Sequence, residues 1–243
     1  MINFKIGCSG YQYVEWKGVF YPIDLPKGNW FEFYCEHFNT IELNVTFYKF
    51  PRVEFLKRWY DRAPDNFTFS VKAPRVITHF KKLQDSKRYV RDFYTSLEKG
   101  LKEKNGIVLY QFPPHFEFDD ERLERIVEML DSSFKNVVEF RNASWWNERA
   151  YTAFRDAKII FSGMSHPTLP DPVVVTGQTL YHRFHGVPHL YTSLYAGEDL
   201  ETIASEVAGH KDVREAYIIF NNTSAGAALT NAKQFQELSE LVH

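Results

Sequence analysis

Phe67-Thr-Phe-Ser-Val-Lys72 alternates apolar with polar side chains, which is the pattern of a β-strand with one buried face. The segment 86–104 then carries apolar residues at helical spacing, and Ile107-Val-Leu-Tyr-Gln111 is apolar again. A strand, a helix and a second strand joined by short connections predict two parallel strands with a helix packed across them.

The same order of strand and helix recurs along the whole chain. We expect strands over Phe4–Ser9, Thr40–Asn44, Phe67–Lys72, Ile107–Gln111, Val137–Arg141, Lys158–Ser162, Leu180–His185 and Ala216–Asn221. We expect helices over Trp30–His37, Arg52–Arg62, Ser86–Lys104, Asp119–Leu130, a segment capped by Ser144, Leu200–Ala208 and Ala225–Leu241, with a long excursion over Gly163–Thr179. About eight such repeats predict a parallel sheet that closes on itself.

The length of the chain bounds the number of domains. Its 243 residues match the roughly 250 residues of one barrel, so we predict an α/β fold, a single TIM-type (β/α)8 barrel, with residues 1–243 as one domain. A doubly wound open sheet is the alternative. Cys8-Ser9-Gly10 disfavours it, because this turn is not the glycine-rich fingerprint of a dinucleotide site.

Composition and charge exclude several classes of protein. The chain is 44% hydrophobic and 25% charged, as globular proteins are, and its net charge of -2 provides no overall attraction to nucleic acid or membrane. The first residues lack a signal-peptide core and no apolar run is long enough to span a bilayer, so we expect a cytoplasmic protein without a membrane partner. Cys8 and Cys35 are expected to be buried thiols rather than a disulfide.

Charged or amide side chains end several of the expected strands. They are Glu42, Lys72, Gln111, Glu139, Arg141, Arg183, His185 and Asn221. Buried charge is costly unless it is paired or used, and the carboxyl ends of barrel strands carry the active sites of TIM barrels. We therefore predict a polar pocket at the C-terminal face.

Four of these residues are predicted to be catalytic: Glu42, Lys72, Glu139 and Arg141. Glu42 would be the acid/base, Lys72 and Arg141 would stabilise developing negative charge, and Glu139 would orient Arg141. The structural alternative makes Glu42 an ion-pair partner of Lys72 or Arg141, and makes Glu139 and Arg141 a self-satisfied pair. In a dry pocket Lys72 would instead act as a base or an amine nucleophile.

Ten further residues are predicted to bind substrate. They are Tyr11, Trp16, Asn44, Tyr48, His79, Gln111, Trp145, Arg183, His185 and Asn221. The aromatic members either stack on a base or sugar or pack across the barrel mouth, and His185 is either functional or a hydrogen-bonded core residue. Asn221 precedes a glycine-containing turn that suits phosphate binding or, alternatively, helix capping by Thr223 or Ser224.

A basic run follows the third expected strand. It consists of Lys72, Arg75, Lys81, Lys82, Lys87, Arg88 and Arg91. The run would attract an anionic substrate or a nucleic-acid backbone, or it is simply a solvated face. We predict no cofactor and no metal ligands, because cations at the strand ends oppose a divalent ion, although one Mg²⁺ held partly by substrate phosphate is compatible with these residues.

Together these motifs resemble the YecE-like family, also called domain of unknown function seventy-two. The resemblance rests on Ile6-Gly-Cys-Ser-Gly10, Thr40-Ile-Glu-Leu-Asn44, Phe69-Ser-Val-Lys72, Gln111-Phe-Pro113, Glu139-Phe-Arg141, Arg183-Phe-His-Gly186 and Phe220-Asn-Asn222. It spans almost the whole chain, and it implies a TIM-type barrel without an established reaction.

Three functions are compatible with these residues. The first is an enzyme, a hydrolase or lyase, that acts on a phosphate- or carboxylate-bearing small molecule or on a nucleic-acid-derived substrate. The second is a non-catalytic binder of nucleic acid or nucleotide, which would use the basic run and the aromatic residues. The third is a glycoside hydrolase, which requires Glu42 and Glu139 to be neighbouring carboxylates that face open space. No oligomeric state is predicted.

Overall fold

Eight parallel strands form one sheet in the computed structural model, which describes residues 1–242. They are β1 (Asn3–Cys8), β2 (Thr40–Leu43), β3 (Thr68–Lys72), β4 (Asn105–Gln111), β5 (Asn136–Glu139), β6 (Ile160–Ser165), β7 (Thr179–Phe184) and β8 (Glu215–Phe220). Their order in the sheet is β1-β8-β7-β6-β5-β4-β3-β2. The predicted fold class is confirmed, because this chain is an α/β protein with a single TIM-type (β/α)8 barrel.

Helices alternate with the strands along the chain. They are α1 (Trp30–Cys35), α2 (Val45–Tyr48), α3 (Val53–Arg62), α4 (Lys87–Gly100), α5 (Asp120–Met129), α6 (Glu148–Asp156), α7 (Gly197–Gly209) and α8 (Ala227–Leu241). A π-helical turn covers Val76–Phe80 and a 3-10 turn covers Ser224–Gly226. None of the helices in residues 1–242 has the length and apolar character needed to cross a membrane.

The chain divides into two compact units. The first unit comprises Met1–Glu42 together with the chain from Gly163 onward, and the second unit comprises Leu43–Ser162. Each unit has its own strands, helices and apolar core.

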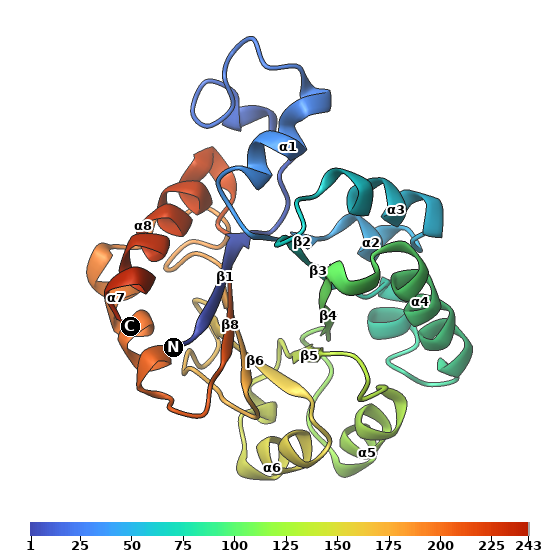
Figure 1. The fold of residues 1–243 in the computed structure, drawn as a ribbon. Coiled ribbons are helices and arrows are strands. Elements are labelled where there is room, and N and C mark those ends of the chain that lie inside the picture. Colours follow the sequence, from blue (N-terminus) through green and yellow to red (C-terminus); the bar gives the residue numbers. More distant parts are fainter. Residues whose placement is uncertain (243) are drawn as a thin grey trace. The chain divides into compact units, whose positions relative to one another are not determined.

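The first unit is built on β1, β8 and β7, which pair in parallel and in continuous register. Figure 1 shows α8 outside β1 and β8, and α7 packs against α8. Gly7 of β1 lets the following strand approach closely, because a Cβ here would lie 2.0 Å from the carbonyl oxygen of Thr40. A larger residue at this position would push the start of β2 away from β1.

The second unit contains β3, β4 and β5 in parallel, and β5 pairs with the first residues of β6. Outside them, α3 and α4 pack side by side (Figure 1). Gly100 of α4 permits this contact, since a Cβ there would lie 2.5 Å from the Cβ of Leu56 in α3. Part of the core is a stack of aromatic rings whose planes differ by at most 14°: Phe112, Phe116, Phe140 and Trp145.

The sixth strand differs from the sequence prediction. We expected Lys158–Ser162, whereas β6 runs from Ile160 to Ser165. Gly163 lies within β6. A Cβ at this position would come within 2.8 Å of Nδ1 of His182 in β7, so only glycine fits here without a shift. The small size of glycine is therefore needed for packing against β7. Gly163 does not end the strand, although glycine often weakens or interrupts a strand.

Helix caps are predicted correctly in one case and wrongly in another. Asp119 caps α5 as expected, by accepting a hydrogen bond from the backbone N–H of Arg122 at 2.7 Å. The expected cap of the sixth helix, Ser144, lies in a preceding 3-10 turn. Asn147 caps α6 instead, by accepting from the backbone N–H of Ala150 at 2.9 Å.

The last helix also begins later than predicted. Ala225 and Gly226 have φ angles of 51° and 82°, which lie in the left-handed region, so α8 starts at Ala227. No side-chain cap bond from Thr223 or Ser224 starts these helices within the described residues. The turn after β8 is therefore shaped by its backbone rather than by helix capping.

Cys8 and Cys35 are thiols, as predicted. Cys8 is buried in β1, and burial raises the pKa of its thiol well above the ordinary value. Cys35 ends α1 and is half-buried. The expectation of two buried thiols is therefore correct for Cys8 alone.

Candidate functional site

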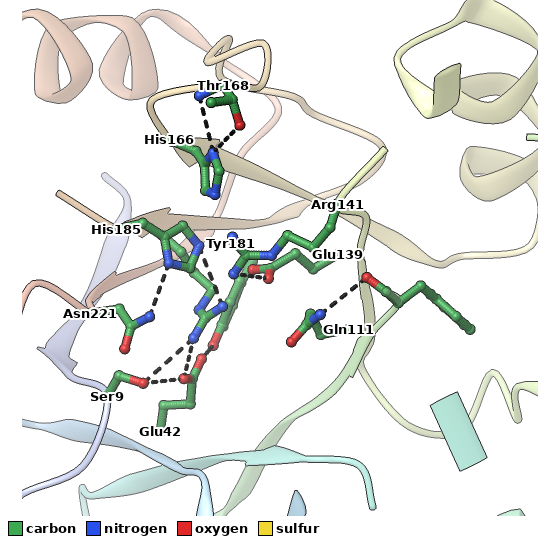
Figure 2. A network of polar contacts seen from close by, with 12 residues as sticks. Ser9, Glu42, Gln111, Glu139, Arg141, His166, Thr168, Tyr181, His185 and Asn221 are labelled. Carbon is green, nitrogen blue, oxygen red and sulfur yellow. Dashed lines mark hydrogen bonds and ion pairs between the residues drawn. The ribbon is translucent and has the colours of Figure 1, made fainter. Parts of the chain in front are cut away.

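Glu42 of β2 is fully buried in the first unit, and three side chains donate hydrogen bonds to its carboxylate. Ser9 Oγ and Arg183 Nη2 each donate to Oε1 at 2.5 Å. Tyr181 OH donates to Oε2 at 2.8 Å, and Figure 2 shows Ser9 and Tyr181 directed at Glu42. Ser9 follows β1, while Tyr181 and Arg183 share one face of β7 because they are two residues apart.

The ion pair between Glu42 and Arg183 lies in a dry interior, since the two side chains are 0% and 1% exposed. Removing such charges from water costs several kcal/mol per ion, and their attraction repays this only when further hydrogen bonds are present. Ser9 and Tyr181 supply these bonds. Of the three donors, only the two hydroxyl groups can exchange a proton with Glu42, because a guanidinium does not deprotonate in proteins.

His185, which follows β7, is also fully buried. Its Nδ1 lies 3.0 Å from Asn221 Nδ2, and its Nε2 lies 3.5 Å from Arg183 Nη1. Both neighbours are N–H donors and a neutral imidazole accepts at one nitrogen only, so at most one of these contacts is a hydrogen bond to the ring. His166, directly after β6, lies with its ring centroid 5.7 Å from that of His185 (Figure 2).

Aromatic side chains support the loop that follows β1. Tyr13 OH donates to the carbonyl oxygen of Ser9 at 2.6 Å, and burial raises the pKa of Tyr13, which keeps the hydroxyl protonated. Trp16 donates its Nε1 proton to the carbonyl oxygen of Thr223 at 2.9 Å. Trp16 is 0% exposed and Tyr11 is 6% exposed, so both rings are buried among other side chains.

The second unit holds a separate ion pair. Arg141 Nη2 lies 2.8 Å from Glu139 Oε1, and the two side chains are 12% and 0% exposed. Glu42 pairs with Arg183, a partner that the structural alternative did not name, and the expected pair of Glu139 with Arg141 forms. Each of the two glutamates is buried against a guanidinium.

His79 lies in a positive environment within the second unit. It belongs to the π-helical turn after β3, and its pKa is lowered to about 4. Burial is the largest cause, followed by the positive charges of Lys72, His115 and Arg141. We call Lys72, His79, His115 and Arg141 the cationic cluster.

Aromatic rings adjoin the cationic cluster. Lys72 Nζ lies 4.6 Å from the ring centroid of Phe47, and the His79 ring meets Phe47 edge-to-face at 4.9 Å. Tyr48 is in edge contact with Phe47 and is exposed. Of the predicted aromatic residues, Tyr48 therefore has a ring that a ligand can reach.

Other predicted site residues of the second unit have structural contacts. Gln111 ends β4, is nearly buried, and donates from Nε2 to the carbonyl oxygen of Phe112 at 3.1 Å. Asn44 precedes α2 and is half-buried. Trp145 is fully buried in the ring stack and donates to the carbonyl oxygen of Phe116 at 2.7 Å, so we assign it to packing.

The predicted residues gather in two groups, one in each unit. The group in the first unit is Glu42, Arg183, His185 and Asn221. The group in the second unit is Lys72, His79, Glu139 and Arg141.

Four residues that contact or act on these groups are absent from the sequence prediction. Tyr181 had a signal, since period two places it on the face of Arg183. Ser9 also had one, as the last residue of the first expected strand. His166 was missed because the sixth strand was expected to end at Ser162, whereas it ends at Ser165. His115 lies in a loop without a strand or helix pattern that would have indicated a site.

Metal ligands do not cluster in the described part of the chain. Among residues 1–242, no group of three or more His, Cys, Asp or Glu side chains is placed to hold a metal ion. Each carboxylate of the two groups has a guanidinium as its neighbour instead.

Comparison with known proteins identifies relatives over the whole chain. Residues 5–243 match the family described as "Protein of unknown function DUF72". The chain is 27% identical over 261 residues to UPF0759 protein YunF of Bacillus subtilis (strain 168), and the aligned region covers 91% of this chain and 90% of YunF. It is 31% identical over 118 residues to UPF0759 protein YecE of Escherichia coli (strain K12), covering 47% and 42%. A crystal structure of a DUF72 family protein from Thermotoga maritima has 30% identity and a TM-score of 0.89, covering 98% and 99%.

Proposed function

We propose, given that this chain belongs to the DUF72 family of proteins of unknown function, that it is an enzyme acting on an anionic small molecule. The substrate would carry a phosphate or a carboxylate, and the reaction would be that of a hydrolase or a lyase. The proposed catalytic residues are Glu42, Lys72, Glu139 and Arg141.

The observation that carries this proposal is the buried carboxylate of Glu42 with three directed donors. Burying a carboxylate in a barrel interior costs desolvation free energy, and an apolar residue of similar size would avoid that cost. Strand ends at the carboxyl side of a barrel are where TIM-barrel enzymes place their catalytic groups. We infer that Glu42 is kept for acid–base chemistry.

Proton transfer at Glu42 would run through a hydroxyl group. Glu42 and Ser9 are both fully buried, and Ser9 Oγ lies 2.5 Å from Glu42 at the start of the loop after β1. As Ser9 took a proton from the substrate it would pass its own proton to Glu42, and the reverse step would return it. Arg183 would compensate the charge of Glu42 before the transfer and would remain a fixed donor afterwards.

The cationic cluster supports an anionic substrate. Arg141 is held by Glu139, which fixes the plane of the guanidinium. Lys72 adds a second positive charge, and its effect on the pKa of His79 indicates a field that favours anions. Phosphate or carboxylate oxygens would bind these groups, which would also stabilise negative charge that develops during the reaction.

A thermal-shift panel of phosphates, sugar phosphates, nucleotides and carboxylates tests the binding part of the proposal. At least one anion should raise the melting temperature of the wild type, and Lys72→Met should reduce that shift. Arg149→Ala is the matched control, because Arg149 is an exposed cation of the same unit that pairs with Asp120. An equal shift in wild type and Lys72→Met would contradict the assignment.

Turnover of the stabilising anion tests the catalytic part. Ser9→Ala removes the proposed relay but leaves the ion pair of Glu42 with Arg183, so the protein should fold. General acid–base catalysis contributes roughly a hundredfold to ten-thousandfold, so kcat should fall by that order while the affinity for the anion changes little. Full activity of Ser9→Ala would exclude the relay.

A further inference from the structure

The surface near α2 exposes aromatic rings beside a cation. Tyr48 and Phe80 are 69% and 68% exposed, although rings of this size are usually buried for most of their area. The guanidinium carbon of Arg75 lies 5.9 Å from the ring centroid of Tyr48 and 5.3 Å from that of Phe80. We call Tyr48, Arg75 and Phe80 the aromatic ladder.

Two further cations, Lys81 and Lys82, follow the ladder residue Phe80 in the sequence. Lys81 follows Phe80 directly and lies 5.7 Å from the ring centroid of Tyr89, which is itself 38% exposed. Lys82 comes next, and Asp85 is the first carboxylate after it. Exposed rings alternate here with cations rather than with carboxylates.

A groove is lined by residues of α2, of α3 and of the segment between them, which begins directly after Tyr48. It has a volume of about 530 Å³ and is both apolar and basic. Its apolar and cationic lining residues include Val45, Phe50, Phe55, Lys49, Arg52 and Arg58. Glu54 supplies the carboxylate of the lining, so cations outnumber acids in the groove. The volume is within the range of roughly 300–1,000 Å³ that is usual for sites of small ligands.

The cations of this surface are not neutralised by the protein. Within residues 1–242 no ion pair engages Arg75 of the ladder, nor Arg52 and Arg58 of the groove. Some other exposed cations of the second unit are paired, as Lys57 is with Asp61. Uncompensated charge next to exposed apolar rings suits a polyanion that also carries flat, apolar groups.

We propose that the aromatic ladder and the groove bind single-stranded nucleic acid. Its bases would stack on Tyr48 and Phe80, and its phosphates would pair with Arg75 and with the cations of the groove. A duplex hides its base faces within the helix, so rings that bind by stacking select unpaired strands. This site uses none of the four proposed catalytic residues and does not depend on the enzyme proposal.

Fluorescence anisotropy with a short labelled oligothymidylate tests the inference in the full-length chain. An abasic strand of the same length carries the same charge without bases, and a duplex of the same length hides them. The oligothymidylate should bind more tightly than either probe. Equal affinity for the abasic strand would overturn the proposal, because charge alone would then explain binding, and so would the absence of binding at low salt.

Variants assign the binding to these side chains. Replacing Tyr48 and Phe80 together by Ala should weaken binding about tenfold or more, since stacking on one aromatic ring is worth about 1–3 kcal/mol per base. Tyr191→Ala is the control, because Tyr191 is a 48% exposed ring of the first unit. Wild-type affinity of the double variant, with circular dichroism showing an intact fold, would overturn the proposal.

The salt dependence gives an independent readout. Arg52→Ala should lower the slope of log affinity against log salt by about 0.7, the value for one phosphate contact on a single strand. Lys57→Ala removes an exposed but paired cation and should leave the slope unchanged. The two proposals fail separately, because loss of the small-anion thermal shift tests the cationic cluster, whereas loss of strand binding tests the ladder.

Discussion

Glu42 is a costly residue for the first unit to bury, and its surroundings show how that cost is met. One oxygen accepts from Ser9 and Arg183, and the other accepts from Tyr181. The pair with Arg183 joins positions 141 residues apart in the sequence. Each member of the network depends on the others, so the effects of single substitutions will not simply add.

Glu42→Gln should destabilise the protein strongly, because it leaves the Arg183 guanidinium buried without a counter-charge. The expected loss is about 3–5 kcal/mol in the free energy of unfolding, measured by urea denaturation. The double variant Glu42→Gln with Arg183→Met should recover a substantial part of this loss, since both charges are then absent. A loss below about 1 kcal/mol in the single variant would mean that the interior is more hydrated than its burial indicates.

Contacts between elements explain two features of this barrel that local sequence propensity does not predict. Gly100 lies inside α4, where glycine is a poor helix former, yet it gives α3 room to pack. Asn147 caps α6 although a serine three residues earlier matches the same signal. The glycine in α4 is explained by the neighbouring helix α3. The cap of α6 is set by the 3-10 turn after β5, which contains Ser144 and ends before Asn147.

Gly100→Ala should destabilise the protein despite the higher helix propensity of alanine. The new Cβ would lie 2.5 Å from Leu56 Cβ, so α3 and α4 would have to separate. We expect a net loss of about 1–3 kcal/mol by urea denaturation, the usual cost of overpacking. Gly209→Ala in α7 meets nothing within 4 Å and should be neutral or slightly stabilising. Equal behaviour of the two variants would contradict the packing argument.

Asn147→Ala should cost about 1 kcal/mol, because it removes the side-chain acceptor of the Ala150 backbone N–H at the start of α6. Asn147→Asp keeps an acceptor there and should restore most of the stability. The same denaturation series measures both variants. If alanine and aspartate at this position gave equal stability, the cap bond would not contribute.

Over the whole molecule, buried histidines make stability depend on pH. His182 in β7 is fully buried, and in the described residues neither ring nitrogen has a hydrogen-bond partner. Burial lowers its pKa to about 3, and that of His79 falls to about 4. Both remain neutral in the folded chain at acidities where the unfolded chain takes up a proton.

Stability should therefore fall as the pH drops below the ordinary histidine pKa of 6.5 and continue to fall toward about 3. The unfolded state binds more protons in this window, so His182 alone should cost about 2 kcal/mol near pH 5. His182→Leu should flatten the dependence of unfolding free energy on pH, whereas replacing the exposed His189 by Gln should not. An unchanged slope in His182→Leu would show that His182 is not the responsible group.

The barrel and the polar strand ends followed from the sequence by itself. Alternation in Phe67–Lys72 and helical spacing in Ser86–Lys104 are local patterns, and short-range backbone geometry turns them into strands and helices. A charged residue in a strand that must be buried, such as Glu42, is equally visible without coordinates.

Only the tertiary structure decided which groups meet. Glu42 pairs with Arg183, which lies 141 residues away in the sequence, and Trp16 donates a hydrogen bond to the carbonyl oxygen of Thr223. β6 extends to Ser165, and Gly163 within it leaves the space that His182 occupies. These outcomes depend on distances between segments remote in the chain, and spacing along a sequence does not contain them.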